Sequence, residues 1–235
     1  MAGTALSQFR AILAPVNKEG YKFVAIGAAA AILAYLLSLN TLALLFLLIT
    51  GALAFFFRDP SRTVPQRDGL VVAPADGLVI GIETVTPPAE LNLGDGQRTR
   101  VSIFLSLLDV HVTRSPVAGR IETSVHTPGV FKNAGAPEAP SENERQSFVI
   151  ETGNAVKLGV VLVAGFVARR IVTDIKAGDT VIAGQRIGLI RFGSRVDLYI
   201  PSATLFVSEG QRTLAGETVI ADLASQEANR SFQRI

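Results

Sequence analysis

The longest apolar stretch of the chain lies near its N-terminus, where no charged residue occurs between Phe23 and Phe57. These 35 residues exceed one membrane-spanning helix, which needs about 20 residues, and fall just short of two full ones. A polar break at Ser38-Leu39-Asn40 divides the stretch near its middle. The pattern therefore predicts a hairpin of two apolar helices, Phe23–Leu37 and Thr41–Phe57, with both ends on the same side.

Positive charges flank this hairpin, with Lys18 and Lys22 before it and Arg58, Arg62 and Arg67 after it. Because segments rich in Lys and Arg stay in the cytoplasm, we expect a cell-membrane protein whose main domain is cytoplasmic. The alternative is a helical hairpin buried in a soluble core, since apolar segments this short occur in both settings. The predicted organisation is an N-terminal cytoplasmic segment 1–22, a membrane hairpin 23–57 and a main domain 58–235.

Beyond Pro60, short runs of β-branched and apolar residues alternate with glycine and proline. Runs of this length, without a long amphipathic helix, predict a mainly β domain. The rhythm Gly-Asp-x-Val-x-x-Gly-x-x-Ile from Gly178 to Ile187 is similar to that of lipoyl-like barrel-sandwich folds, which favours a compact β-domain of that kind. The predicted strands are Leu70–Ala73, Leu78–Val85, Arg100–Leu107, Gly119–Val125, Ser147–Thr152, Ala155–Ala164, Ala168–Thr173, Gln185–Arg191 and Val196–Ile200.

Composition narrows the possible partners. The 235 residues include 22 Lys and Arg against 20 Asp and Glu, a formal net charge of +2. Without a lysine-rich run or an aromatic-basic stripe, nucleic acid is not an expected partner, whereas an anionic membrane suits a mildly basic domain beside an apolar hairpin. The chain has no cysteine and only two histidines, His111 and His126. Disulfides and thiolate metal sites are therefore excluded, and we expect no metal centre.

Six short motifs, in this order, resemble those of the short bacterial and archaeal form of phosphatidylserine decarboxylase. The likeness extends from the hairpin to about residue 205. Each motif is weak alone, and their common order makes the resemblance specific. The motifs are Phe56–Pro60, Ala73–Gly77, Asp109–Pro116, Asn143–Arg145, Ala164–Ile171 and Arg191–Asp197.

The resemblance implies a proenzyme that cuts itself between Gly193 and Ser194, giving a β-chain of residues 1–193 and an α-chain of residues 194–235. The Ser194 hydroxyl attacks the carbonyl of the preceding residue to give an ester, and elimination then yields dehydroalanine, which hydrolyses to a covalent pyruvoyl group and ammonia. This group is the implied cofactor. It forms a Schiff base with the amine of phosphatidylserine and accepts electrons as carbon dioxide departs, which yields phosphatidylethanolamine. Taken by itself, the Gly-Ser pair is typical of a turn.

The resemblance also assigns roles to Asp76 and His111. An alcohol is a poor nucleophile at neutral pH, so His111 is expected to act as the base toward Ser194, with Asp76 as its orienting carboxylate. Longer relatives carry a second histidine in this segment that is absent here, so His111 serves both cleavage and decarboxylation or another group protonates the product. His126 matches no motif and is interpreted as structural. Without the resemblance, Asp76 is typical of an Asp-Gly turn and His111 of a buried structural histidine.

The substrate carries a phosphodiester and a carboxylate, both of which call for cations. Arg114, Lys132 and Arg145 are candidates because they lie in or beside the motifs, and solvated surface charge is the alternative for each.

The sequence leaves several functions open. The lipid is phosphatidylserine or an ether-lipid analogue such as archaetidylserine, which share a head group. A non-catalytic, membrane-anchored lipid-binding β-domain would make Gly193-Ser194 a turn. A lipoyl-like carrier would need a lysine at a hairpin tip, and the turns at Asp76-Gly77 and Ala118-Gly119 have none. A homo-oligomer is also left open.

Overall fold

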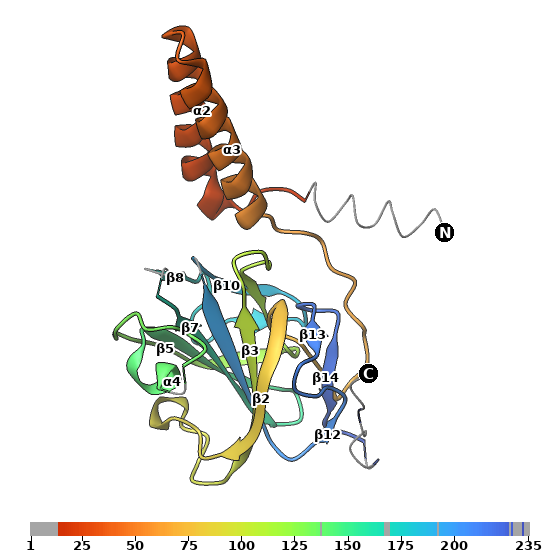
Figure 1. The fold of residues 1–235 in the computed structure, drawn as a ribbon. Helices are drawn as coiled ribbons and strands as arrows, with labels where there is room; N and C mark the ends of the chain where they lie inside the picture. The colour runs from red at the N-terminus through yellow and green to blue at the C-terminus, as the bar shows by residue number, and fades with distance from the viewer. Residues whose placement is uncertain are drawn as a thin grey trace. The chain divides into compact units, whose positions relative to one another are not determined.

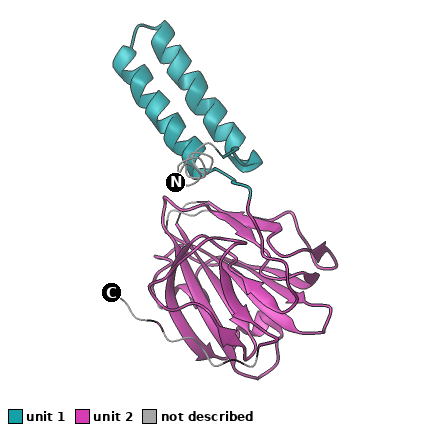
Figure 2. Ribbon diagram, turned by 90° about the vertical axis from the view of Figure 1, so that its right-hand side faces the viewer, with its two compact units in different colours: residues 1–61 teal, residues 62–235 magenta. Residues whose placement is uncertain are grey.

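The computed structural model describes residues 14–136, 138–166, 170–191, 193–225, 227 and 232. The chain divides into two compact units, residues 1–61 and residues 62–235 (Figures 1 and 2). The boundary lies four residues beyond the predicted end of the hairpin. Each unit is described by itself below.

The first unit is a helical hairpin (Figure 2). A short 3₁₀ turn, η1 (Lys18–Gly20), leads into α2 (Tyr21–Leu36), and α3 (Asn40–Phe56) follows. Ser38 adopts a φ of 61° in the connection, which is where the sequence predicted the break. The expected apolar hairpin is therefore confirmed, with helix ends displaced by one or two residues.

The two helices pack closely where Gly27 faces Thr50, because a Cβ at Gly27 would lie 2.4 Å from the Thr50 hydroxyl oxygen. Many of their large side chains point away from the partner helix, and Leu36 is 72% exposed. Among the described residues, the segment Lys18–Leu36 is long and apolar enough to cross a membrane, and Asn40–Phe56 is a shorter apolar helix.

The second unit is mainly β, as the sequence predicted (Figure 1). Within the described residues its largest sheet has eight strands in the order β13-β2-β3-β11-β7-β6-β5-β9, and it curls into a half-barrel. Two three-stranded sheets, β1-β14-β12 and β4-β10-β8, complete the domain. The strands are β1 Leu70–Val72, β2 Gly77–Val85, β3 Arg98–Leu105, β4 Val112–Arg114, β5 Gly119–Thr127, β6 Arg145–Glu151, β7 Lys157–Ala164, β8 Ile171–Val172, β9 Thr180–Val181, β10 Arg186–Ile190, β11 Ser194–Ile200, β12 Thr204–Leu205, β13 Arg212–Thr213 and β14 Val219–Asp222.

Each of the nine predicted strands has a counterpart, although in the run predicted as Ala168–Thr173 the first two positions lie outside the described residues. The structure adds β4, β9, β12, β13 and β14, which are two to four residues long. The rhythm starting at Gly178 forms β9 and β10, which belong to different sheets. That segment therefore carries the chain from one layer of the domain to another.

Strand β11 lies in the middle of the eight-stranded sheet, between β3 and β7. Its side chains alternate between two faces, as strand geometry requires. Val196, Leu198 and Ile200 belong to the main hydrophobic core. Tyr199 belongs to a second, smaller cluster on the other face, together with Val161 and Val163 of β7.

Two loops cover this second cluster. The first contains the 3₁₀ turn η2 (Ala89–Leu91), and the second contains the short helix α4 (Ala139–Glu142). Leu91 and Ala139 from these loops are buried in the cluster. Both faces of β11 are therefore shielded from water, and every one of its residues is buried.

Candidate active site

Ser194 is the first residue of β11, and the sheet holds it from both sides. It pairs with Leu105 at the end of β3 and with Ala164 at the end of β7. The residue has no exposed surface, and its hydroxyl oxygen has no hydrogen-bond partner within the described part of the chain. A buried polar atom without a partner costs free energy, so such an atom in a native protein calls for an explanation, of which a catalytic role is one.

Gly193, the residue before it, has a left-handed φ of 63°. This conformation costs glycine little and strains other residues, which explains the residue type at this bend. The carbonyl oxygen of Gly193 points at Gly165, where a Cβ would lie only 2.3 Å from that oxygen. The absence of a side chain at Gly165 is therefore what makes room for the Gly193 carbonyl.

Asn143 holds the segment that ends in Gly165. Its side chain is fully buried, and its Nδ2 donates to the carbonyl oxygens of Ala164 at 2.7 Å and Lys132 at 2.9 Å. Its Oδ1 accepts from the Lys132 N–H at 3.1 Å. In the sequence, Asn143 belongs to a motif and had no predicted role. A buried amide can bind two main-chain segments at once, so Asn143 links the segment at Lys132 to the segment at Ala164.

His111 lies immediately before β4 and is almost completely buried. Two main-chain links bring it toward Ser194. First, the carbonyl oxygen of His111 accepts from the N–H of Ile190, which lies four residues before Ser194. Second, Leu105 pairs with Ser194, and the loop that follows Leu105 leads directly to His111. His111 is thus connected through the main chain to the segments on both sides of Ser194 in the fold.

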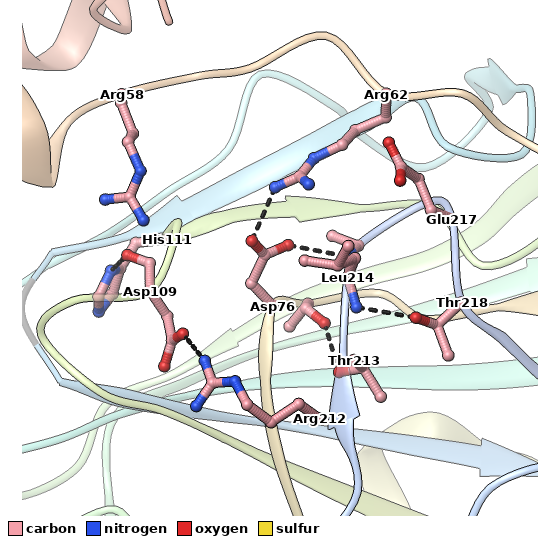
Figure 3. Close-up of polar contacts among 12 residues, drawn as sticks. Arg58, Arg62, Asp76, Asp109, His111, Arg212, Thr213, Leu214, Glu217 and Thr218 are labelled. Carbon is pink, nitrogen blue, oxygen red and sulfur yellow. Dashed lines mark hydrogen bonds and ion pairs between the residues drawn. The ribbon is translucent and has the colours of Figure 1, made fainter. Parts of the chain in front are cut away.

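The His111 ring is oriented by a main-chain group. Its Nδ1 lies 3.0 Å from the carbonyl oxygen of Asp109, as Figure 3 shows. If Nδ1 carries the proton and donates to that oxygen, Nε2 is left as the basic nitrogen. This is the tautomer that a general base requires, with the carbonyl of Asp109 in the orienting role.

The carboxylate of Asp109 fixes the loop that leads to His111. It accepts from the N–H of Ser106 at 2.8 Å and from the Ser106 hydroxyl at 2.7 Å, and it forms an ion pair with Arg212 (Figure 3). In the sequence, Asp109 belongs to a motif and had no predicted function. Its contacts reach Arg212, more than 100 residues away, and no local pattern reveals such a partner.

Asp76, the predicted orienting carboxylate, lies at the same end of the sheet (Figure 3). One oxygen accepts from Arg62 at 2.7 Å, and the other accepts from the main-chain N–H of Ala215 at 2.8 Å. Burial raises the pKa of Asp76 above its usual value, while the nearby Arg62 guanidinium and the Ala215 N–H act in the opposite direction. These contacts connect the segment before β2 to the C-terminal part of the domain.

The three predicted substrate cations each contact another group of the protein. Arg114 is buried in β4 and donates to the carbonyl oxygen of Gly184 at 2.8 Å. Lys132 forms an ion pair with Glu142. Arg145 forms an ion pair with Glu90 at 2.5 Å. Arg145 is in register with Val163 and Arg195, and residues in register share a sheet face. Because successive residues of a strand alternate between faces, the Arg145 side chain lies on the face opposite that of Ser194. Each cation thus has a partner within the protein.

The chain is similar to known proteins along most of its length. The sequence profile of the family described as phosphatidylserine decarboxylase matches residues 49–221. A relative from Nitrobacter winogradskyi, named phosphatidylserine decarboxylase proenzyme, is 49% identical over 225 residues, which cover 95% of this chain and 90% of the relative. A relative of the same name from Xanthobacter autotrophicus is 45% identical over 233 residues and 99% of each chain.

Proposed function

The chain belongs to the phosphatidylserine decarboxylase family, and from that premise we propose that it is made as a proenzyme that cuts its own main chain between Gly193 and Ser194. The enzyme is a carboxy-lyase that converts phosphatidylserine to phosphatidylethanolamine. Both relatives carry the word proenzyme in their names, which supports processing into a β-chain, 1–193, and an α-chain, 194–235. No observation favours the ether-lipid substrate or a non-catalytic lipid-binding domain.

The single observation that carries the cleavage proposal is the buried Ser194 hydroxyl, which has no hydrogen-bond partner in the described part of the chain and directly follows a glycine with a left-handed backbone. A serine used only to fill a turn would satisfy its hydroxyl with nearby main-chain groups. This one begins a central strand and leaves its oxygen available for reaction with the neighbouring carbonyl.

The proposed cleavage uses groups of this chain alone. Nε2 of His111 removes the hydroxyl proton as Oγ of Ser194 attacks the Gly193 carbonyl carbon, and the same proton passes to the nitrogen of Ser194 as the C–N bond breaks. The product is an ester. Loss of the Cα proton of Ser194 and rupture of its Cβ–Oγ bond then release Gly193 as a carboxylate. The dehydroalanine that remains takes up a proton at its Cβ and becomes an imine, which water hydrolyses to a ketone and ammonia.

The residues present fit a pyruvoyl group at position 194, because the atoms that must react are adjacent and sequestered from bulk water. Once formed, the group supplies an electron sink for decarboxylation. The sheet holds residue 194 in place between Leu105 and Ala164. His111 is the proposed proton carrier, and Asp109 orients it through its carbonyl.

We further propose that the apolar hairpin embeds in the membrane and that the domain is cytoplasmic. The exposed apolar surface of α2 and α3 supports the first statement, and the cations that flank the hairpin support the second.

Replacement of Ser194 by alanine tests the proposal. We expect Ser194→Ala to remain one polypeptide on a denaturing gel, because the nucleophile and the precursor of the ketone are both lost. Ser147→Ala is the matched control, since Ser147 in β6 is equally buried and its hydroxyl also has no partner among the described residues. Cleavage of Ser194→Ala at the normal rate would rule the proposal out.

The role of His111 is tested separately through the rate of self-cleavage. His111→Ala should slow the conversion of precursor by about 10²–10⁴-fold, the usual contribution of a general base. The control is His126→Ala, which removes the exposed second histidine. Processing of His111→Ala at the rate of the control would remove His111 from the cleavage step.

A further inference from the structure

Three large apolar side chains are exposed to solvent at the end of the sheet where Ser194 lies. Leu107 is 53% exposed, Leu108 is 72% exposed and Phe166 is 76% exposed. We call these three residues the apolar rim. Large exposed apolar side chains that cluster on a soluble surface mark a place where a partner binds.

The rim flanks Ser194 from both neighbouring strands. Leu105 and Ala164 are the residues that pair with Ser194 in β3 and β7. Leu107 follows Leu105 by two positions, and Phe166 follows Ala164 by two positions. The rim residues therefore lie in the two loops that emerge on either side of the first residue of β11.

The loop that carries the two leucines, residues 106–109, has a fixed conformation, and we call it the leucine loop. It forms a tight turn in which the Asp109 N–H donates to the Ser106 carbonyl oxygen at 3.0 Å. The Asp109 carboxylate closes the same turn by accepting from Ser106, and Arg212 binds that carboxylate from β13. Leu107 and Leu108 occupy the two central positions, so the fold itself fixes them at the tip.

Exposed arginine side chains are found in segments that contact the loops next to the apolar rim. Arg212, which contacts the leucine loop through Asp109, has a side chain that is 63% exposed. Arg170 is also exposed, and its carbonyl oxygen accepts from the N–H of Arg191, two residues before Gly193. Apolar side chains beside cations suit the interface of an anionic bilayer, where apolar groups reach the acyl chains and cations meet the phosphates.

We propose that the apolar rim inserts into the surface of a phospholipid bilayer and holds the Ser194 end of the domain against the head groups. The inference rests on the proposed function, because a lipid whose chains remain in the bilayer can react only where the site meets the membrane. A second copy of the chain is the other occupant to consider. It would cover the end of β11 at which the lipid has to arrive, so the bilayer is favoured.

The absence of cysteine from the chain permits a direct test with the full-length protein. Single cysteines at Leu107 and Phe166 are labelled with an environment-sensitive fluorophore, and the protein is reconstituted with vesicles of phosphatidylcholine and phosphatidylserine. Ile182→Cys is the matched control. Ile182 is apolar and 67% exposed. It directly follows β9, which lies at the end of the sheet opposite to the end that contains Ser194.

Both rim probes should shift their emission to the blue on vesicles and be quenched by lipids that carry a nitroxide on the acyl chain, whereas the probe at position 182 should stay water-like. Water-like emission from both rim probes on vesicle-bound protein would overturn the proposal. So would a blue shift that is already present in detergent, disappears on dilution and is insensitive to the nitroxide, because that result identifies a second copy as the occupant.

A denaturing gel of each preparation separates this inference from the proposed function. Quenched rim probes on a chain that is never cut would support the membrane contact and defeat self-cleavage. Cut chains with unquenched rim probes would support self-cleavage and defeat the membrane contact.

Discussion

At the scale of single residues, two glycines shape the bond that is proposed to break. Gly193 supplies the left-handed bend, and Gly165 supplies the space into which the Gly193 carbonyl oxygen points. The attack of a hydroxyl on a carbonyl requires the reacting atoms to be held in a narrow range of positions. The contact between Gly165 and the carbonyl is therefore part of the cleavage geometry.

Gly165→Ala should slow self-cleavage on the order of 10²-fold, because its Cβ would displace the Gly193 carbonyl. Gly119→Ala is a matched control, since its Cβ would lie at the same 2.3 Å from a main-chain oxygen, that of Glu151, at the other end of the strands. Precursor conversion is followed on gels, and thermal unfolding of both variants is recorded. Equal loss of cleavage in the two variants would mean that Gly165 acts only through stability.

The sequence singled out Gly193, Ser194, His111 and Asp76 because motif residues carry their chemistry in their type and order. It could not reveal what Gly165 and Asn143 do, because their roles consist of contacts with segments 11 or more residues away. The contact between the His111 ring and the Asp109 carbonyl could not be predicted either, since a main-chain carbonyl does not depend on residue type.

At the scale of elements, the position of β11 determines what cleavage does to the protein. The proposed cut falls at the start of a strand that pairs along its length with β3 and β7, both in the proposed β-chain. The buried side chain of Arg195 also binds Asp197 at 2.6 Å and Ser102 of β3 at 2.8 Å. Breaking one main-chain bond therefore leaves the sheet intact.

We expect the two chains to remain together after cleavage, because separation would expose β11 and the core residues packed on it. Native size-exclusion chromatography in detergent should give one species that contains both chains, and guanidinium chloride should separate them. Uncut Ser194→Ala, the control, should elute at the same native volume and stay whole in denaturant. Native elution of a free α-chain would contradict this prediction.

The longer strands could be predicted from the sequence because alternation and β-branched runs persist over five or more residues. Strands such as β9, β12 and β13 have only two residues each and show no periodicity. They form because neighbouring strands offer hydrogen bonds, which is tertiary information. The same limit applied to η2 and α4, whose apolar residues are buried by the sheet face below them.

At the scale of the whole molecule, the chain combines an apolar helical hairpin with a β-domain that has its own core. The hairpin could be predicted from the long uncharged stretch alone. The domain's reactive end could not, because loops from β3, β7 and β10 meet there only after folding. In the proposed mechanism the hairpin keeps the enzyme at the membrane, and the apolar rim brings the reactive end to the lipid.

The whole mechanism depends on the conversion of Ser194 into a ketone by the chain itself. Intact-mass spectrometry of the purified protein tests this conversion directly. We expect two chains, residues 1–193 with an ordinary carboxylate and residues 194–235 lighter by one ammonia than a chain that begins with serine. A fully active preparation that consists only of the uncut chain would show that the mechanism is wrong.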